Sequence, residues 1–250
     1  MVQADATALS VSNLAAGYGA HEVLADVSFD VASGEMVGLI GLNGAGKTTL
    51  LKSILDLRFL DGGDVRIFGA RHTDPRSRRA LAFLPEQIAP SPVLKGREWL
   101  RMALAPYDVR WDRPAADSVC RRLALDPDAL DRRVTTFSKG MGQKLGLVAM
   151  FLSERPLLVL DEPMSGLDPL ARLRLKAFLL DYRDAGNAIF FSSHILADVA
   201  ALCDRLAVLH EGRVAFFGTP DELRRVAEVS DLELAFLDAI DGGTPETAAV

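Results

Sequence analysis
Alternation of apolar and polar side chains marks the first part of the chain as rich in strands. Residues 9–14 and 23–31 alternate in this way, and residues 15–22 (AAGYGAHE) are expected to form the loop between them. Residues 35–40 (EMVGLI) are a short apolar run, which predicts a buried strand. Further short strands are expected at residues 65–68 and 81–84.

Helical spacing of apolar residues first occurs from about residue 47 to residue 57. Residues 89–150 lose the strand pattern and show helical spacing at 98–105, 118–125 and 141–152. Strands are then expected at 157–160, 188–192, 206–209 and 214–217, and helices at 170–182 and 196–202. Such alternation favours a mainly parallel α/β sheet that is interrupted by a helical insertion.

The composition is typical of a soluble globular protein with an acidic balance. The 250 residues are 49% hydrophobic and 25% charged, and the formal net charge is −6. Basic clusters at residues 71–79 and 132–133 are interpreted as solvated loop charges, so no nucleic acid partner is expected. Cys120 and Cys203 lack metal-ligand spacing and fit a reducing compartment. No signal peptide or membrane-spanning run is indicated, so a cytoplasmic location is expected.

A glycine-rich loop follows the apolar run at residues 35–40. Its sequence, GLNGAGKT (residues 41–48), has the phosphate-loop pattern of two glycines five positions apart followed by Lys-Thr. Glycines let backbone N–H groups approach phosphates, and the following helix adds its positive dipole end. Lys47 is expected to bridge the terminal phosphates, and Thr48 is expected to ligate Mg²⁺. The flanking strand and helix disfavour a plain glycine-rich turn. The expected nucleotide contacts are Gly41, Asn43, Gly44, Ala45, Gly46, Lys47, Thr48 and Thr49.

Two carboxylates directly follow the predicted strand at residues 157–160. A strand end of this kind lies at the sheet edge where such folds bind ligands. Asp161 suits Mg²⁺, and Glu162 could polarise a water for attack on a γ-phosphate. A merely structural acidic pair is the minor alternative beside the phosphate loop. His194 follows another strand, and functional and structural roles for it are equally open. These residues predict a Mg²⁺-dependent nucleoside triphosphatase.

The stretch FSKGM (residues 137–141) completes a set of motifs that resembles the ATP-binding cassette family over about residues 7–225. It lies where that family carries its LSGGQ-like signature. The resemblance implies an α/β fold: a P-loop NTPase core with a mainly parallel sheet, an N-terminal antiparallel β-subdomain and an inserted α-helical subdomain. It also implies ATP and Mg²⁺, and a second ATPase subunit, identical or different, whose nucleotide this signature caps. Ser138 is also a candidate helix N-cap, and the two roles are compatible. The signature residues expected to act on the partner's nucleotide are Ser138, Lys139, Gly140 and Met141.

The resemblance assigns further residues by position. Tyr18, in the loop after the first strand, resembles the family's adenine-stacking aromatic. Glu162 resembles the catalytic base, and His194 resembles the switch histidine that contacts the γ-phosphate. The loop that crosses the dimer interface is expected at Ser165, Gly166, Leu167 and Asp168.

Two departures from the family pattern stand out. Lys139 replaces the first signature glycine, and Met141 replaces the final glutamine. Where the family has glutamine directly after a proline, Glu86 follows Pro85 and Gln87 comes next. Either Glu86 or Gln87 is therefore a candidate for contact with Mg²⁺, because both offer hard oxygen donors.

The resemblance also predicts the division of the chain. The ATPase core is expected at residues 1–88 and 151–228, the helical signature subdomain at 89–150, and a C-terminal tail at 229–250, disordered after Gly242. The helical subdomain would receive a coupling helix from a membrane subunit.

Segments 94–100 and 231–237 resemble the exporter-type subgroup, which serves drug, lipid or polysaccharide export with separate membrane subunits. An integral membrane permease subunit is therefore the expected partner, and export is favoured over import. The chain is expected to be cytoplasmic and peripheral on the inner face of the cell membrane. The alternative is a soluble cassette ATPase that acts on ribosomes or nucleic acid.

Overall fold

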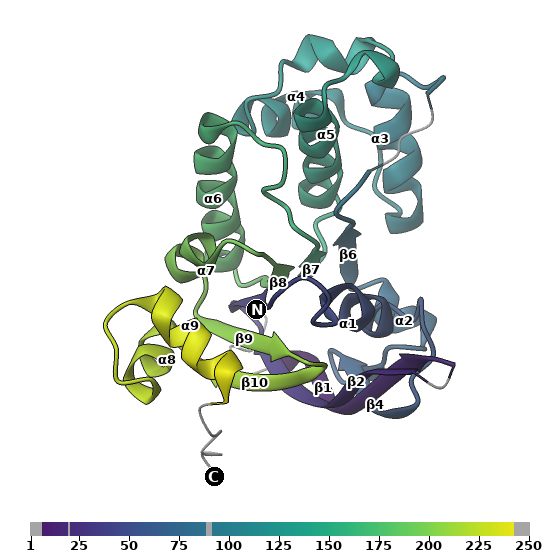
Figure 1. Cartoon of the computed structure of the whole chain (residues 1–250). Coiled ribbons are helices and arrows are strands. Elements are labelled where there is room, and N and C mark those ends of the chain that lie inside the picture. The colour runs from purple at the N-terminus through teal and green to yellow at the C-terminus, as the bar shows by residue number, and fades with distance from the viewer. Residues whose placement is uncertain (1–6, 20, 89–91, 243–250) are drawn as a thin grey trace.

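Two β-sheets and the helices around them make up the computed structural model of the chain (Figure 1), which describes residues 7–19, 21–88 and 92–242. The strands are β1 (Thr7–Tyr18), β2 (His21–Ala32), β3 (Met36–Ile40), β4 (Gly62–Ile67), β5 (Ala70–Arg71), β6 (Leu81–Leu84), β7 (Leu157–Leu160), β8 (Ala188–Ser192), β9 (Arg205–His210) and β10 (Arg213–Gly218). The α-helices are α1 (Lys47–Ile54), α2 (Pro75–Arg78), α3 (Gly96–Leu104), α4 (Arg113–Arg122), α5 (Lys139–Leu152), α6 (Pro169–Asp184), α7 (Leu196–Leu202), α8 (Pro220–Val226) and α9 (Leu232–Asp241).

The larger sheet has six strands in the order β10-β9-β3-β8-β7-β6, and all of its neighbours are parallel except the pair β9 and β10. The smaller sheet is antiparallel, in the order β2-β1-β4-β5. Helices α3, α4 and α5 lie together beyond the edge strand β6, at the top of Figure 1. The predicted fold, with a mainly parallel core, an N-terminal antiparallel sheet and an inserted helical region, is confirmed.

The central strands are buried on both faces, which explains why they are continuous apolar runs. In β7, Leu158 and Leu160 pack into a core shared with the helical region and α6. Leu157 and Val159 point to the opposite face and pack with residues of β1, β2 and α1. Because side chains alternate along a strand, β7 contributes to the hydrophobic cores on both faces of the sheet. This packing on both faces fixes the carboxyl end of the strand.

The first two strands are longer than the sequence analysis predicts. β1 continues to Tyr18 and β2 begins at His21, so most of the expected loop at residues 15–22 is strand. The pairing of β1 with β2 shifts its register at several points, for example between Val11 and Leu14. These bulges break the alternation of apolar residues on which the prediction depended. Tyr18 therefore lies at the end of a strand and not within a long loop.

Several predicted helices have different bounds in the structure. The helix expected at 98–105 begins at Gly96, and the one expected at 118–125 is α4, at 113–122. Pro114 lies in the first turn of α4, a position that suits proline, and Ala124 has a φ of +53° that ends helical geometry. Helix α1 ends at Ile54 and not at residue 57, because Asp56 adopts a φ of +56°.

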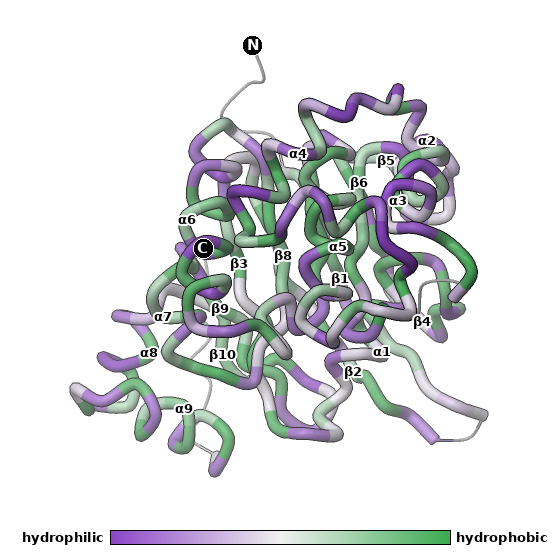
Figure 2. The backbone as a smooth tube through the Cα atoms, turned by 90° about the horizontal axis from the view of Figure 1, so that it is seen from above, coloured by the Kyte–Doolittle hydropathy of each residue, from purple (hydrophilic) through white to green (hydrophobic). Residues whose placement is uncertain are grey.

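The region assigned to a C-terminal tail contains helix α9, which the sequence analysis did not predict. Asp231 caps its start by accepting hydrogen bonds from the backbone N–H groups of Glu233 and Leu234. Leu232, Ala235 and Ile240 are its buried residues, and Figure 2 shows hydrophobic and hydrophilic stretches alternating along α8 and α9. The expected disorder after Gly242 lies outside the described residues.

Candidate functional site
The phosphate-loop motif spans the turn from β3 to α1. Gly44 and Gly46 have φ values of +87° and +108°, which glycine adopts without strain. A Cβ at Gly41 would lie 2.3 Å from the carbonyl oxygen of Leu209, so only glycine fits there. The Lys47 ammonium donates hydrogen bonds to the carbonyl oxygens of Gly41 (2.7 Å) and Leu42 (3.2 Å). The loop therefore curls around its own lysine at the start of α1.

Lys47 lies in a mainly negative environment. Burial lowers the pKa of its ammonium, while the carboxylates of Glu162, Asp161 and Glu86 act in the opposite direction. These three acidic side chains come from the ends of β7 and β6, which are neighbours in the sheet. The topology thus places one cation opposite three carboxylates at the carboxyl edge, where open α/β sheets bind ligands.

Ser192 joins the two carboxylates that end β7. Its hydroxyl donates a hydrogen bond to Asp161 Oδ1 (2.6 Å) and accepts one from the backbone N–H of Glu162 (2.9 Å). Burial raises the pKa of Asp161, and the hydrogen bond from Ser192 acts against that shift. Sequence reasoning missed Ser192, although the stretch FSSH at residues 191–194 contains it; the parallel pairing of Leu160 with Phe191 brings the two strand ends together.

Glu162 and His194 are in direct contact, with 2.8 Å between Glu162 Oε2 and His194 Nδ1. The Glu162 backbone has a φ of +48°, an uncommon conformation for a glutamate that turns the chain sharply after β7. Burial raises the pKa of the Glu162 carboxyl, and His194 acts against that shift. The Glu162 side chain is mostly buried, whereas the His194 side chain is 59% exposed. The pair thus presents a carboxylate and an imidazole together at the mouth of the site.

These residues line one cavity of about 460 Å³, which is within the range of small-molecule sites. Its lining residues are Tyr18, Val23, Asn43, Gly44, Gly46, Lys47, Thr48, Thr49, Glu86, Asp161, Glu162, Ser165 and His194. Gln87 is not among them, and neither are Gly41 and Ala45 of the phosphate loop. The hydroxyl of Thr48 and the carboxylates of Asp161 and Glu86 are hard oxygen donors, so the residues present fit a Mg²⁺ ion.

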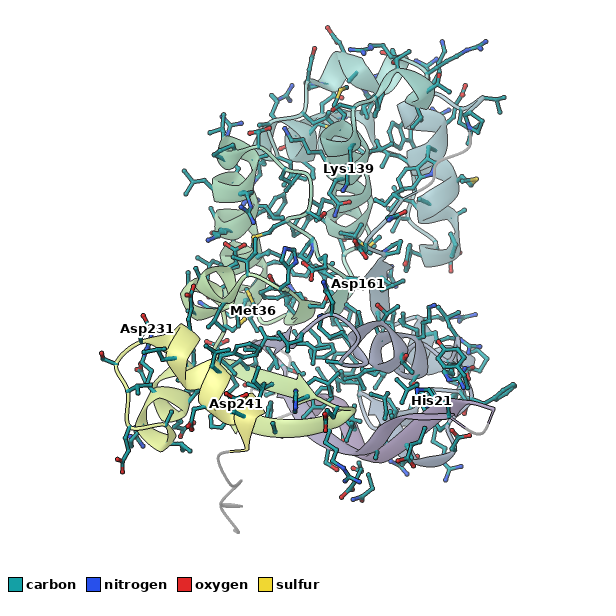
Figure 3. All side chains as sticks on the ribbon, in the orientation of Figure 1. His21, Met36, Lys139, Asp161, Asp231 and Asp241 are labelled. Carbon is teal, nitrogen blue, oxygen red and sulfur yellow. The ribbon has the colours of Figure 1, made fainter. Side chains whose placement is uncertain are left out.

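The signature segment starts helix α5 and does not line this cavity. Ser138 caps the helix, since its hydroxyl accepts a hydrogen bond from the backbone N–H of Met141 (3.2 Å). A Cβ at Gly140 would lie 2.7 Å from the carbonyl oxygen of Gly166, so the two glycines bring this segment close to the loop that follows Glu162. In Figure 3, Lys139 lies in the upper, helical part of the molecule and Asp161 lies lower, near its middle. Lys139 is exposed to solvent.

Comparisons with known proteins point to a single family. The family model for ABC transporters matches residues 24–165, more than half of the chain. An uncharacterized ABC transporter ATP-binding protein of Nostoc is 37% identical over 199 residues, which are 78% of this chain and 59% of that protein. The bacitracin transport ATP-binding protein of Enterococcus faecalis is 33% identical over 82% of this chain and 67% of that protein. The chain thus spans about three fifths to two thirds of the length of these relatives.

A solved structure described as the ATP-binding subunit of an ABC transporter is also similar. It superimposes with a TM-score of 0.84 at 38% sequence identity, over 92% of this chain and 98% of that one. The part of the chain that the family model matches contains the phosphate loop, the two carboxylates after β7 and the signature at the start of α5. The chain therefore belongs to the ABC transporter family, as one of its ATP-binding cassettes.

Proposed function
We propose that this chain binds ATP and Mg²⁺, hydrolyses ATP, and works as one of two cassettes that drive a separate membrane subunit. The observation that carries the proposal is the contact between Glu162 and His194 in the same cavity as Lys47. This cavity offers a cation for the terminal phosphates and a carboxylate that can accept a proton. A pure nucleotide-binding regulator would need neither the carboxylate nor the imidazole.

Binding of the triphosphate is assigned to the phosphate loop. The N–H groups at Gly44, Gly46 and the start of α1 would surround the phosphates, and Lys47 would exchange its two carbonyl contacts for phosphate oxygens. Thr48 and Asp161 would hold Mg²⁺, with Glu86 as the third donor, because Glu86 and not Gln87 lines the cavity. When bound, the ion supplies positive charge that neutralises the phosphates.

Glu162 is proposed as the general base. Its raised pKa, which burial causes, makes this carboxylate a better proton acceptor than an exposed glutamate. Ser192 fixes the Glu162 backbone, and His194 fixes the carboxylate oxygen Oε2. His194 is proposed to orient Glu162 and, from its exposed position, to contact the γ-phosphate.

The signature at residues 138–141 is proposed to act on the nucleotide of a second cassette. This proposal is supported by its position outside the chain's own cavity, at the exposed start of α5. Ser165, Gly166 and Asp168 would cross the interface between the two cassettes. ATP would then favour the closed pair because the signature touches the γ-phosphate only in that state.

The helical region around α3 to α5 is proposed to receive a coupling helix from an integral membrane permease. The division of the chain into two core parts, a helical subdomain and a C-terminal tail stays a prediction. None of the helices in the described ranges is long and apolar enough to cross a bilayer. The resemblance to cassettes that work with separate membrane subunits is the reason for assigning the membrane part of the transporter to a partner. The relative named for bacitracin transport supports a transporter role. Export, and a cytoplasmic position on the inner face of the membrane, are proposed from the resemblance to exporter-type cassettes.

The test is a pull-down from native membranes with the Glu162→Gln protein in ATP and Mg²⁺, which is expected to accumulate the ATP-bound state. Lys47→Ala is the matched control, because it should lose the nucleotide. Stoichiometric recovery of a polytopic membrane protein with Glu162→Gln, and less with the control, is the expected result. Recovery of ribosomes or nucleic acid without a membrane protein would favour the soluble alternative and overturn the transporter role.

A further inference from the structure
The ring of Tyr18 is already covered on one face by a cation from the same chain. The guanidinium carbon of Arg58 lies 3.8 Å from the centre of the Tyr18 ring. Tyr18 ends β1 beside Gly19, and 52% of its surface is exposed. Arg58 comes from the segment that follows α1, some forty positions later in the sequence. The contact therefore results from tertiary packing and not from local chain geometry.

The two residues differ in their relation to the nucleotide cavity. Tyr18 and Val23 line the cavity, and Arg58 does not. Arg58 therefore covers one face of the Tyr18 ring without itself lining the cavity. This arrangement leaves the other face of the ring for a ligand that enters beside the phosphate loop.

The Tyr18 ring is the main partner of Arg58. Its Nε is buried without a hydrogen bond, and the guanidinium makes no ion pair with any residue in the described ranges. A buried guanidinium nitrogen without an acceptor is costly, and the negatively polarised face of an aromatic ring partly compensates for it. The structure thus keeps Arg58 on the ring although carboxylates such as Asp56 and Asp61 are close in sequence.

We propose that Arg58 is a positioning residue for the nucleotide base: it holds the Tyr18 ring in the orientation on which a purine stacks. This inference rests on the proposed nucleotide site and adds a residue to it. An exposed tyrosine at a strand end would otherwise sample several rotamers and would lose this freedom when the base binds. The cation also withdraws electron density from the ring, which favours stacking of a π-rich base on the opposite face.

A positioning role for Arg58 predicts which ligands lose affinity when Arg58 is removed. Arg58 contributes through Tyr18 to base binding alone, so it has no effect on ligands that lack a base. Because stacking involves no base-specific hydrogen bond, ADP and GDP depend on Arg58 equally. The effect of losing Arg58 also disappears when Tyr18 is absent, since the two residues then act as one unit.

The experiment is isothermal titration calorimetry of the full chain with ADP, which lacks the γ-phosphate and so supports neither hydrolysis nor closure. Inorganic tripolyphosphate, measured by displacement of ADP, is the base-free probe. The variants are Arg58→Ala, Arg58→Lys, Tyr18→Ala and the double variant Arg58→Ala with Tyr18→Ala. Arg71→Ala is the control, because it removes an arginine whose side chain is 71% exposed and lies outside the cavity.

We expect Arg58→Ala to weaken ADP binding about three- to tenfold and to leave tripolyphosphate binding unchanged. Arg58→Lys should give an intermediate loss, Arg71→Ala none, and the double variant the same loss as Tyr18→Ala. Arg58→Gln, which keeps a planar group without charge, replaces Arg58→Ala if that protein does not fold. Equal losses for ADP and tripolyphosphate, or additive losses in the double variant, would overturn the proposal.

The ADP affinities of Tyr18→Ala and Arg58→Ala separate a wrong role for Arg58 from a wrong base site. If Tyr18→Ala weakens ADP binding and Arg58→Ala does not, Tyr18 remains the base platform and only the role of Arg58 is wrong. If Tyr18→Ala binds ADP as well as the unmodified chain does, the base platform itself is wrong, and the inference falls with it.

Discussion
The Lys144 ammonium lies 3.0 Å from Asp168 Oδ2 and thereby ties the signature helix α5 to the loop that follows Glu162. Lys144 is 9% exposed and also donates a hydrogen bond to the carbonyl oxygen of Ala124 (3.0 Å). One position earlier, the Gln143 amide donates a hydrogen bond to the carbonyl oxygen of Pro163 (3.2 Å). The segment from 163 to 168 is thus attached at both ends to α5.

This attachment predicts the effect of Lys144→Met. The variant keeps most of the side-chain volume but frees Asp168, so the loop and the signature lose their fixed relation. We expect the ATPase turnover number to fall about ten- to hundredfold while ATP affinity changes little, because misplacement affects the reacting geometry more than binding. Steady-state kinetics and ATP titration measure the two quantities. Asp168→Asn still accepts the N–H of Ala171 at the start of α6, so its turnover number should fall less. A normal turnover number in Lys144→Met contradicts the role of the contact.

Removal of the phosphate-loop lysine should weaken nucleotide binding. Lys47→Ala loses a charge-assisted contact to the phosphates, worth about 1.5–3 kcal/mol, so ATP affinity should fall about ten- to hundredfold. Lys52→Ala is the control, since Lys52 lies on the same helix α1, is exposed and does not line the cavity. Calorimetric titration with ATP decides between them, and equal affinities for the two variants are incompatible with the assigned role of Lys47.

Ser192→Ala should affect both stability and catalysis. The variant leaves the Glu162 N–H and a carboxylate oxygen of Asp161 without their partner, and an unsatisfied buried polar group costs about 1–3 kcal/mol. We expect a lower free energy of unfolding in urea and a turnover number about tenfold lower. Ser193→Ala removes a hydroxyl that accepts the N–H of Ile195 (3.0 Å) and donates a long hydrogen bond to its carbonyl oxygen (3.4 Å), and it touches neither carboxylate. This variant should be much milder. If the two variants behave alike, Ser192 does not position the carboxylates.

The buried thiol of Cys120 predicts a pH dependence of stability. Burial, assisted by the nearby Asp117 carboxylate, raises the pKa of Cys120 from 9.0 to about 12. The folded state therefore favours the neutral thiol. Its contribution to stability is complete below about pH 9 and is lost as the pH rises from 9 towards 12, at up to about 1.4 kcal/mol per pH unit.

Urea unfolding of the unmodified chain and of Cys120→Ala between pH 7 and pH 10.5 isolates this contribution from other groups. The difference in unfolding free energy between the two proteins should be constant up to about pH 9 and should change above it, in the direction that disfavours the chain with Cys120. A difference that stays constant over the whole range would show that the thiol is not buried in its neutral form.

The sequence alone predicts the site residues that belong to short motifs, because the residue types and their spacing within each motif are characteristic. The phosphate loop comes directly after β3, and Asp161 and Glu162 come directly after β7. Each motif is continuous in the sequence, so its position at a strand end can be predicted without the structure. The structure brings them together with His194, for which the residues alone left two roles open. It also places Glu86 and not Gln87 at the cavity. The sequence motif left both residues as candidates, because it does not show which of two neighbouring side chains points into the site.

Other features depend on contacts between distant segments. Ser192 has no distinct signal because serines are common at strand ends, and only the register of β7 with β8 reveals its role. Arg58 reaches Tyr18 across the fold, and Lys144 reaches Asp168 from one helix to the start of another. Helix α9 packs against α8, β9 and β10, and these strands lie well before it in the sequence.

In the proposed function, ATP joins two copies of the cassette, or this cassette and a different one, through the signature of each. Light scattering after size-exclusion chromatography of the Glu162→Gln chain measures this directly, with ATP and Mg²⁺ in one sample and with ATP and a chelator in the other. We predict that the molar mass rises from that of one 27.0 kDa chain to that of two only when Mg²⁺ is present. Lys139→Glu, which places a negative charge at the exposed start of α5, should abolish the rise without preventing ATP binding. A chain that binds ATP stoichiometrically and remains monomeric, alone and together with its membrane partner, would contradict the account.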